Sequence, residues 1–377
     1  MTILVQLKMK LVLLLLMLFR VSDMANVTED ESELERQVKI MNKPAVKTFV
    51  AKEGDIIDCI DINKQPALDH PLLKNHRVQV EPNLHFNRFE RFSPNEKFVK
   101  FRSREPCPIG TVPIPRVTKE NLRSARSLPK MPSMAAVKHD AVASNQHVVS
   151  LREDAIEYIK YGCHGAVSVY NLTLAHDQFS SHNMWIETGP PDHISMIVAG
   201  WQGNGYRDGC YNMLCRGFIQ IDRELSPGTP MRAASTYGRD VFAFAIRIDQ
   251  DRETGNWWLH CDDPPIKVGY WPKELFLYLR NGSLHTAWGG VGLAGSDGVC
   301  PPMGSGHKPD GNFRHATYFR TLQWVNRFGD ALPPTANISK WVDKSNVYGF
   351  KNHGFVIRGM KGYTISFGGP GGYCGGK

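Results

Sequence analysis

Five side chains in the C-terminal two thirds of this 377-residue chain are candidates for acid–base chemistry. They are Glu187, His260, His285, Asp297 and His307. Carboxylates and imidazoles are the groups that most often move protons in hydrolysis at acid to neutral pH. A serine-hydrolase triad is not supported, because the sequence has no Gly-x-Ser-x-Gly elbow to expose a nucleophilic serine.

The local context of these residues favours structural roles for most of them. Glu187 precedes Thr-Gly-Pro-Pro, a turn sequence, so we expect a solvent-facing carboxylate there. His260 ends a short strand, where a histidine hydrogen-bonded to the backbone is favoured over a general base. Asp297 lies in a Gly-Ser-Asp-Gly turn, and His307 has no nucleophilic partner.

The cysteines predict disulfides. An even number in a secreted chain favours disulfide pairs over free thiols. The Cys-x4-Cys spacing of Cys210 and Cys215 has no second Cys/His pair nearby at zinc spacing, so we predict no metal and no cofactor. The eight residues are Cys59, Cys107, Cys163, Cys210, Cys215, Cys261, Cys300 and Cys374.

The N-terminus predicts secretion. Lys8 and Lys10 precede the apolar run Leu11–Phe19, which is too short for the roughly 20 residues that span a bilayer. Residues 1–25 therefore read as a signal peptide, and we expect a secreted product with no membrane span. Behind such a signal, Asn-x-Ser/Thr sequons indicate glycosylation. They begin at Asn26, Asn171, Asn281 and Asn337.

The formal net charge of +8 suggests contact with acidic surfaces such as polyanionic polysaccharide. The lysines and arginines are dispersed, and no nucleic-acid-binding motif accompanies them. We therefore expect no nucleic-acid partner.

The first part of the chain predicts a small α+β unit. Residues 27–40 have acids first, bases later and apolar residues at near-helical spacing, which indicates an amphipathic helix. A β-branched strand at 54–61 and a strand edge at Cys107–Pro115 follow. From Thr118 to about Gln146 the apolar residues follow no sustained period of 2 or 3.6, so this is the best linker candidate. Its basic residues Arg123, Arg126 and Lys130 would be open to a processing protease.

Beyond the linker the pattern is all-β. Only 272–280, with a proline in its first turn, predicts a helix. Short strands with glycine-rich connections indicate an antiparallel sandwich. The expected strands are 165–173, 194–199, 217–222, 241–248, 256–260 and 266–270.

Nine motifs in a fixed order resemble the neprosin family, a largely plant group of secreted proteins. The resemblance runs from about residue 35 to the C-terminus. It implies a neprosin activation peptide (27–130), a linker (131–146) and a neprosin domain (147–377). The motifs are Gly54–Asp61, Lys64–Pro71, Cys107–Pro113, Gly200–Gln202, Gly209–Cys215, Gly255–Trp258, Val268–Pro272, Met303–His307 and Tyr318–Arg320.

The resemblance implies a β-sandwich of two curved antiparallel sheets and a glutamic peptidase that cleaves at proline in acid. In the family two glutamates facing each other across the substrate groove act as base and acid, which requires unequal pKa values. Their positions match Val198 in Ile-Val-Ala-Gly-Trp and Val291 in Trp-Gly-Gly-Val. Valine can neither take up a proton nor polarise water, so no catalytic residue is intact.

Two further departures from the family bear on the groove and the disulfides. The family's hairpin between Gln202 and Cys210 is shortened. Val347 stands where the family has a cysteine that pairs with the C-terminal one, which leaves Cys300 or Cys261 as the partner of Cys374.

Three hypotheses follow. The first is a catalytically silent protein that binds a proline-rich or cell-wall ligand in the old groove, with its own prosegment as a further partner. The second is an active acid prolyl endopeptidase with a rearranged acid pair. The third is a carbohydrate-binding or structural wall protein. The residues expected to line the groove are Trp201, Gln202, Tyr270, Trp271, Trp288 and His307.

Overall fold

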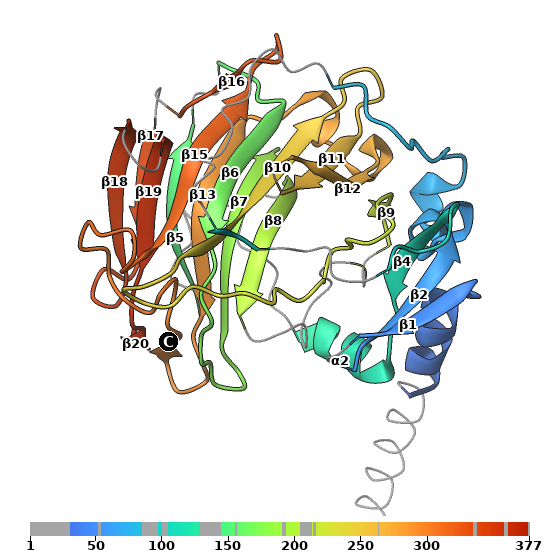
Figure 1. Ribbon diagram of the computed structural model, residues 1–377, viewed down its shortest axis with the longest axis horizontal. Helices are drawn as coiled ribbons and strands as arrows, with labels where there is room; N and C mark the ends of the chain where they lie inside the picture. Colours follow the sequence, from blue (N-terminus) through green and yellow to red (C-terminus); the bar gives the residue numbers. More distant parts are fainter. Residues whose placement is uncertain are drawn as a thin grey trace, which may run out of the picture.

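The computed structural model describes residues 31–51, 54–84, 97–99, 105–127, 145–154, 157–190, 194–203, 213, 216–262, 264–334, 338–357 and 361–375. Two β-sheets form a sandwich, and the described residues 31–127, which we call the N-terminal segment, pack at one edge (Figure 1). The predicted all-β sandwich with a small α+β part before it is confirmed. The predicted signal peptide lies outside the described residues. No helix among the described residues is long and apolar enough to cross a membrane.

The larger sheet has ten strands in the order β18-β19-β15-β6-β10-β11-β12-β9, with β16 beside β15 and β3 beside β10. Only β3 runs parallel to its neighbour. The strands are β3 (Lys97–Phe98), β6 (Gly162–Ser168), β9 (Ile219–Gln220), β10 (Phe242–Gln250), β11 (Trp257–Cys261), β12 (Ile266–Trp271), β15 (Thr317–Val325), β16 (Ala331–Leu332), β18 (Gly349–Val356) and β19 (Gly362–Gly368).

The smaller sheet has five strands in the order β17-β5-β13-β7-β8. They are β5 (Gln146–Glu153), β7 (Phe179–Thr188), β8 (Ser195–Gly203), β13 (His285–Leu293) and β17 (Ile338–Val342). A separate pair near the C-terminus joins β14 (Val299–Cys300) to β20 (Gly372–Tyr373).

The core lies between the two sheets, because alternate residues of each strand point inward. The predicted strand over 241–248 shows this: Phe244, Ile246 and Ile248 are buried in the core. Met184 of β7 and Trp288 of β13 belong to the same core from the smaller sheet. Each such side chain contributes about 1.5–3 kcal/mol by leaving water.

The N-terminal segment has the predicted helix and strands. Residues 31–41 are helical, and Leu34 and Met41 are buried against Val117 and Leu122, which confirms the apolar spacing. The segment's sheet is β1 (Lys47–Val50), β2 (Ile56–Asp61) and β4 (Thr111–Pro115), followed by helix α2 (Lys119–Ser127). Short 3-10 turns lie at Ile62–Lys64, Pro66–Asp69 and Pro71–Leu73.

Two local predictions are wrong. Residues 272–280 form no α-helix but two 3-10 turns, Lys273–Leu275 and Leu279–Asn281, because Phe276 between them is extended. The predicted linker begins with a helix, α2, before it reaches residues outside the described ranges. Thr118 caps that helix, since its hydroxyl accepts the Asn121 N–H at 3.1 Å.

The described disulfides are Cys59–Cys107 and Cys300–Cys374. Of the two partners left open for Cys374, Cys300 is therefore the correct one. Cys261 and Cys163 are free thiols in the described structure, and burial raises the pKa of both. The predicted Cys210–Cys215 pair lies outside the described residues.

Candidate functional site

Val198 and Val291 lie on one face of the five-stranded sheet. β8 and β13 both flank β7, where Val198 is opposite Trp185 and Val291 is opposite Ser181. Trp185 and Ser181 are an even number of residues apart, so all four side chains point to the same side. The core is on the other side, since the intervening Met184 belongs to it.

We call this outer surface the valine face. It carries its own apolar cluster, separate from the core. The cluster consists of the buried Val148, Trp185, Ala287 and Val291 with the partly buried Met196, Val198 and Trp341.

The two valines are related diagonally. Two strand spacings of about 4.8 Å and four residues of about 3.3 Å separate them, so their backbones are roughly 16 Å apart. Trp185 belongs to the same cluster as both. Glutamates at these positions would approach each other across the Trp185 ring, not directly.

Val291 is surrounded by groups that do not ionise in the acid range. It is 1% exposed, and its cross-strand neighbours are Ser181 and Val148. Hydroxyls, carboxamides and hydrocarbons cannot act as a carboxylate, so none of these sheet neighbours could serve as one beside Val291. The diagonal neighbours on the same two strands are Gln146, Ser150, Phe179 and Asn183.

Glu187 is buried, and the expectation of a solvent-facing carboxylate is wrong. It is 1% exposed because β7 continues to Thr188 before the turn begins. It is opposite Met196 and therefore a diagonal neighbour of Val198, with about 7–8 Å between such positions. A carboxylate thus stands near one valine but not near the other.

A polar row of Asp154, His285 and Glu187 crosses one end of the valine face. His285 is opposite Glu187, and its Nδ1 is 3.2 Å from Asp154 Oδ1. The Ser339 hydroxyl donates to Asp154 Oδ2 at 2.7 Å. Burial raises the pKa of Asp154, but the bonds from His285 and Ser339 and the charge of Arg152 outweigh it and hold the pKa at about 2. Asp154 is therefore ionised through most of the acid range.

Besides the Arg152 Nε atom, three buried polar atoms on the valine face have no hydrogen-bond partner in the described structure. They are the indole Nε1 atoms of Trp185 and Trp341 and the hydroxyl of Ser150. Ser150 and Trp341 are opposite each other on β5 and β17. Buried polar groups are nearly always bonded, so unpaired donors on one surface indicate a ligand with acceptors.

Sequence analysis missed these three residues. β7 and β17 were not predicted as strands, and no local pattern shows which distant strands lie side by side. The usable local signal was the run Met184-Trp185-Ile186, whose aromatic and β-branched residues favour a strand.

The remaining acid–base candidates lie away from the valine face. His260 is on the outer face of the larger sheet, where Nδ1 is 3.7 Å from Asp249 Oδ2 and burial lowers the pKa of the ring to about 4. Asp297 caps an exposed turn, as predicted. His307 is exposed, with its ring centroid 4.0 Å from that of Tyr237.

Trp288 is a core residue, and its assignment to the groove is wrong. It is 0% exposed, and its Nε1 donates to the His164 carbonyl at 3.0 Å. Trp288 and Val291 are an odd number of residues apart on one strand, so they point to opposite faces. The Trp-Gly-Gly-Val motif at 288–291 therefore places its tryptophan in the core and its valine on the valine face.

Tyr270 and Trp271, two other expected groove residues, lie on opposite faces of β12. Tyr270 is buried beneath the N-terminal segment, and Trp271 packs from the opposite face of β12 against the core. Trp201 and Gln202 lie on β8, and their side chains are outside the description.

One group of potential metal ligands occurs among the described residues: His147, Cys300 and Cys374. Both sulfurs are joined in a disulfide, and His147 Nδ1 is 2.9 Å from Asp343 Oδ2. This group is therefore unsuited to bind a metal. Of the sequons, Asn171 and Asn281 are exposed, while Asn26 and Asn337 lie outside the described residues.

Two family models match this chain. The model described as Neprosin matches residues 192–370, which include both valines. The model described as Neprosin activation peptide matches residues 48–158, which include β2, β3, β4, β5 and all but the first residue of β1. The boundary between prosegment and domain near residue 130 stays a prediction.

Proposed function

This chain belongs to the neprosin family, a family of peptidase-like proteins with an activation peptide, and we propose that it is a secreted, catalytically silent member that binds proline-rich peptide on the valine face. The signal-peptide pattern, the exposed sequons Asn171 and Asn281 and the net charge of +8 support an extracellular or cell-wall location.

The proposal that hydrolysis is lost rests on the environment of Val291. A two-carboxyl mechanism needs one group to take a proton from water and another to donate one. Val291 is buried, and its cross-strand and diagonal neighbours include no ionisable group. Glu187 could supply one carboxyl near Val198, but no second carboxyl lies among these neighbours of Val291.

The unpaired donors support retained binding. A polyproline II peptide presents carbonyl oxygens along its length, and its prolines have no N–H to donate. Trp185 and Trp341 offer indole N–H groups with no partner in the described structure, beside an apolar surface that suits proline rings. The surface therefore fits an acceptor-rich, apolar ligand.

The test compares a proline-rich peptide with a matched peptide in which alanine replaces proline. Hydrolysis is followed across the acid range, and binding by fluorescence anisotropy. Because Trp185 is 0% exposed in the full-length chain, both uncut and linker-cut protein are used. We expect binding of the proline peptide without turnover.

Removing single donors sharpens the test. Trp185→Phe and Trp341→Phe keep an aromatic ring and remove the N–H, which should weaken binding about 3- to 10-fold each. Trp271→Phe, on the other sheet, is the matched control and should leave affinity unchanged. Equal losses in all three variants, or retention on polysaccharide but not on peptide, would contradict the proposal and favour a carbohydrate-binding wall protein.

A second candidate, a working acid peptidase, is favoured by the row of the buried Glu187 and the partly buried Asp154 and His285. There the Asp154–His285 pair would accept a proton from the attacking water, while Glu187 in its protonated form would donate a proton to the scissile carbonyl oxygen. Cleavage of the proline peptide by the wild type, abolished by both Glu187→Gln and His285→Ala but retained in His307→Ala, would establish this function in place of the first.

A further inference from the structure

The N-terminal segment is part of the main core. Ile60, Val112 and Ile114 belong to the same buried cluster as Phe218 and the sandwich interior. β3 runs parallel to the start of β10 and extends the larger sheet, and the N–H of Val99 donates to the Ala243 carbonyl at 2.9 Å. Removing the segment would therefore open the core and remove a strand.

A second apolar cluster depends on the segment entirely. Trp258 and Tyr270 are both 0% exposed, with their ring centroids 4.8 Å apart on the outer face of the larger sheet. Ala67 and Leu73 of the segment and Ile219 of β9 are the other buried residues of this cluster. Without them two large rings would face water, a patch of the kind that soluble monomers rarely expose.

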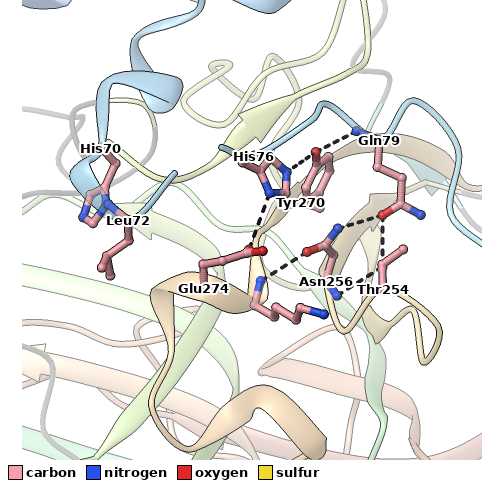
Figure 2. A network of polar contacts seen from close by, with 9 residues as sticks. His70, Leu72, His76, Gln79, Thr254, Asn256, Tyr270 and Glu274 are labelled. Carbon is pink, nitrogen blue, oxygen red and sulfur yellow. Dashed lines mark hydrogen bonds and ion pairs between the residues drawn. The ribbon is translucent and has the colours of Figure 1, made fainter. Parts of the chain in front are cut away.

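The Tyr270 hydroxyl fixes the segment above this cluster (Figure 2). It accepts the Gln79 backbone N–H at 2.8 Å and lies 2.9 Å from His76 Nε2. His76 Nδ1 is also 3.5 Å from Glu274. Burial lowers the pKa of His76, opposed by Glu274 and assisted by the charge of Lys273, so the ring docks in its neutral form.

Asp251 provides a second attachment. It is 0% exposed, and its Oδ2 accepts the Gln79 side-chain N–H at 2.5 Å and the Asn83 backbone N–H at 2.9 Å. Gln79 Oε1 in turn accepts from Asn256 at 2.8 Å (Figure 2). Charge-assisted bonds of this kind are about twice as strong as neutral ones.

Two reciprocal pairs of hydrogen bonds complete the contact. The Gln65 amide accepts the Gln220 N–H at 2.7 Å and donates to its carbonyl at 3.2 Å, so it satisfies β9, the last strand of the larger sheet. The Cys107 N–H donates to the Arg223 carbonyl at 2.9 Å, and the Arg223 guanidinium donates back at 2.7 Å.

We propose that the N-terminal segment is a permanent subunit: when the chain is cut in the predicted linker, the segment stays bound to β9, β10, β11 and β12 as a noncovalent partner. The two outer faces of a sandwich point in opposite directions. No residue of the valine-face cluster comes from the described part of the segment. The segment can therefore stay bound without its described residues covering that face.

The test uses the whole protein with a site for a sequence-specific protease placed within residues 131–144. After complete cutting at neutral pH, size-exclusion chromatography is run at micromolar concentration, and fractions are analysed on denaturing gels. We expect both fragments in one peak and unchanged tryptophan fluorescence. Separation of the fragments, with a red shift as Trp258 becomes exposed, would overturn the proposal.

Two matched variants locate the contact. Tyr270→Phe leaves the partly buried Gln79 backbone N–H without its acceptor, which should weaken fragment association about 5- to 100-fold. Tyr348→Phe removes a buried hydroxyl that donates to the Pro301 carbonyl, far from the segment, and should leave association unchanged. Equal weakening in both variants would mean general destabilisation and would contradict the proposed interface. Retention and hydrolysis are separate properties, so either can fail alone.

Discussion

Restoring the two carboxyls should restore hydrolysis. The perturbation is the double variant Val198→Glu/Val291→Glu, with each single variant beside it. A well-placed general acid or base contributes about 10²–10⁴-fold, so the single variants should stay near background and the double variant should rise at least about 10²-fold above it.

The two replacements should differ in their effect on stability. Val291 is 1% exposed, and an unpaired polar group buried there costs about 1–3 kcal/mol. The unpartnered Ser150 hydroxyl, a diagonal neighbour, can offset about 1 kcal/mol of this through one hydrogen bond. Val198 is only partly buried, so its replacement should lower the melting temperature less.

The same difference in burial assigns the roles. A glutamate at position 291 would be buried away from water, so its pKa should be raised and it should act as the acid. A glutamate at position 198 would be less buried, so it should ionise at a lower pH and act as the base. The assay is cleavage of a fluorogenic proline peptide across the acid range, after circular dichroism and the melting temperature show that each variant is folded.

The control is Val198→Glu/Val148→Glu, since Val148 is the cross-strand neighbour of Val291 on the same face. It adds the same charge and comparable strain in the wrong place, and should stay inactive. A folded, peptide-binding Val198→Glu/Val291→Glu variant that cleaves no faster than this control would refute the assignment of the two positions. Wild-type cleavage at a comparable rate would refute catalytic silence.

Three other predictions concern stability and docking. Association of the cut N-terminal segment should weaken as pH falls below the usual histidine value of 6.5, because docking lowers the pKa of His76. It should weaken again as pH falls below the usual aspartate value of 3.8, because bonds from the segment help to lower the pKa of Asp251. Titration of fragment affinity tests this, and His76→Gln should remove only the weakening that begins near pH 6.5. Replacing Cys300 and Cys374 by serine opens a loop of sequence separation 74 and should lower the free energy of unfolding in urea by about 4 kcal/mol; an unchanged free energy of unfolding would contradict this. Gly200→Ala should abolish soluble expression or lower stability by more than about 3 kcal/mol, since a Cβ there would lie 1.9 Å from a backbone oxygen of β7; a neutral effect would contradict the close strand contact.

Local pattern determined the class of fold, and nine motifs in order resembled the neprosin family, which the two family models confirm. Alternation over 241–248 gave a strand with the correct core face, and apolar spacing gave the helix at 31–41. These features follow from backbone geometry over a few residues, which is why the sequence suffices for them. The identity of Val198 and Val291 is likewise a property of the chain and not of its folding.

Tertiary structure decided which side chains share a surface. Glu187 precedes a turn sequence yet is buried, because β7 runs to Thr188 between two neighbouring strands. Trp288 lies three residues from Val291 yet faces the core, and Trp185 and Trp341, distant in sequence, share the valine face. The sides on which residues point depend on strand register, and register is set by pairing between segments that may be more than a hundred residues apart. No short stretch of sequence contains that information.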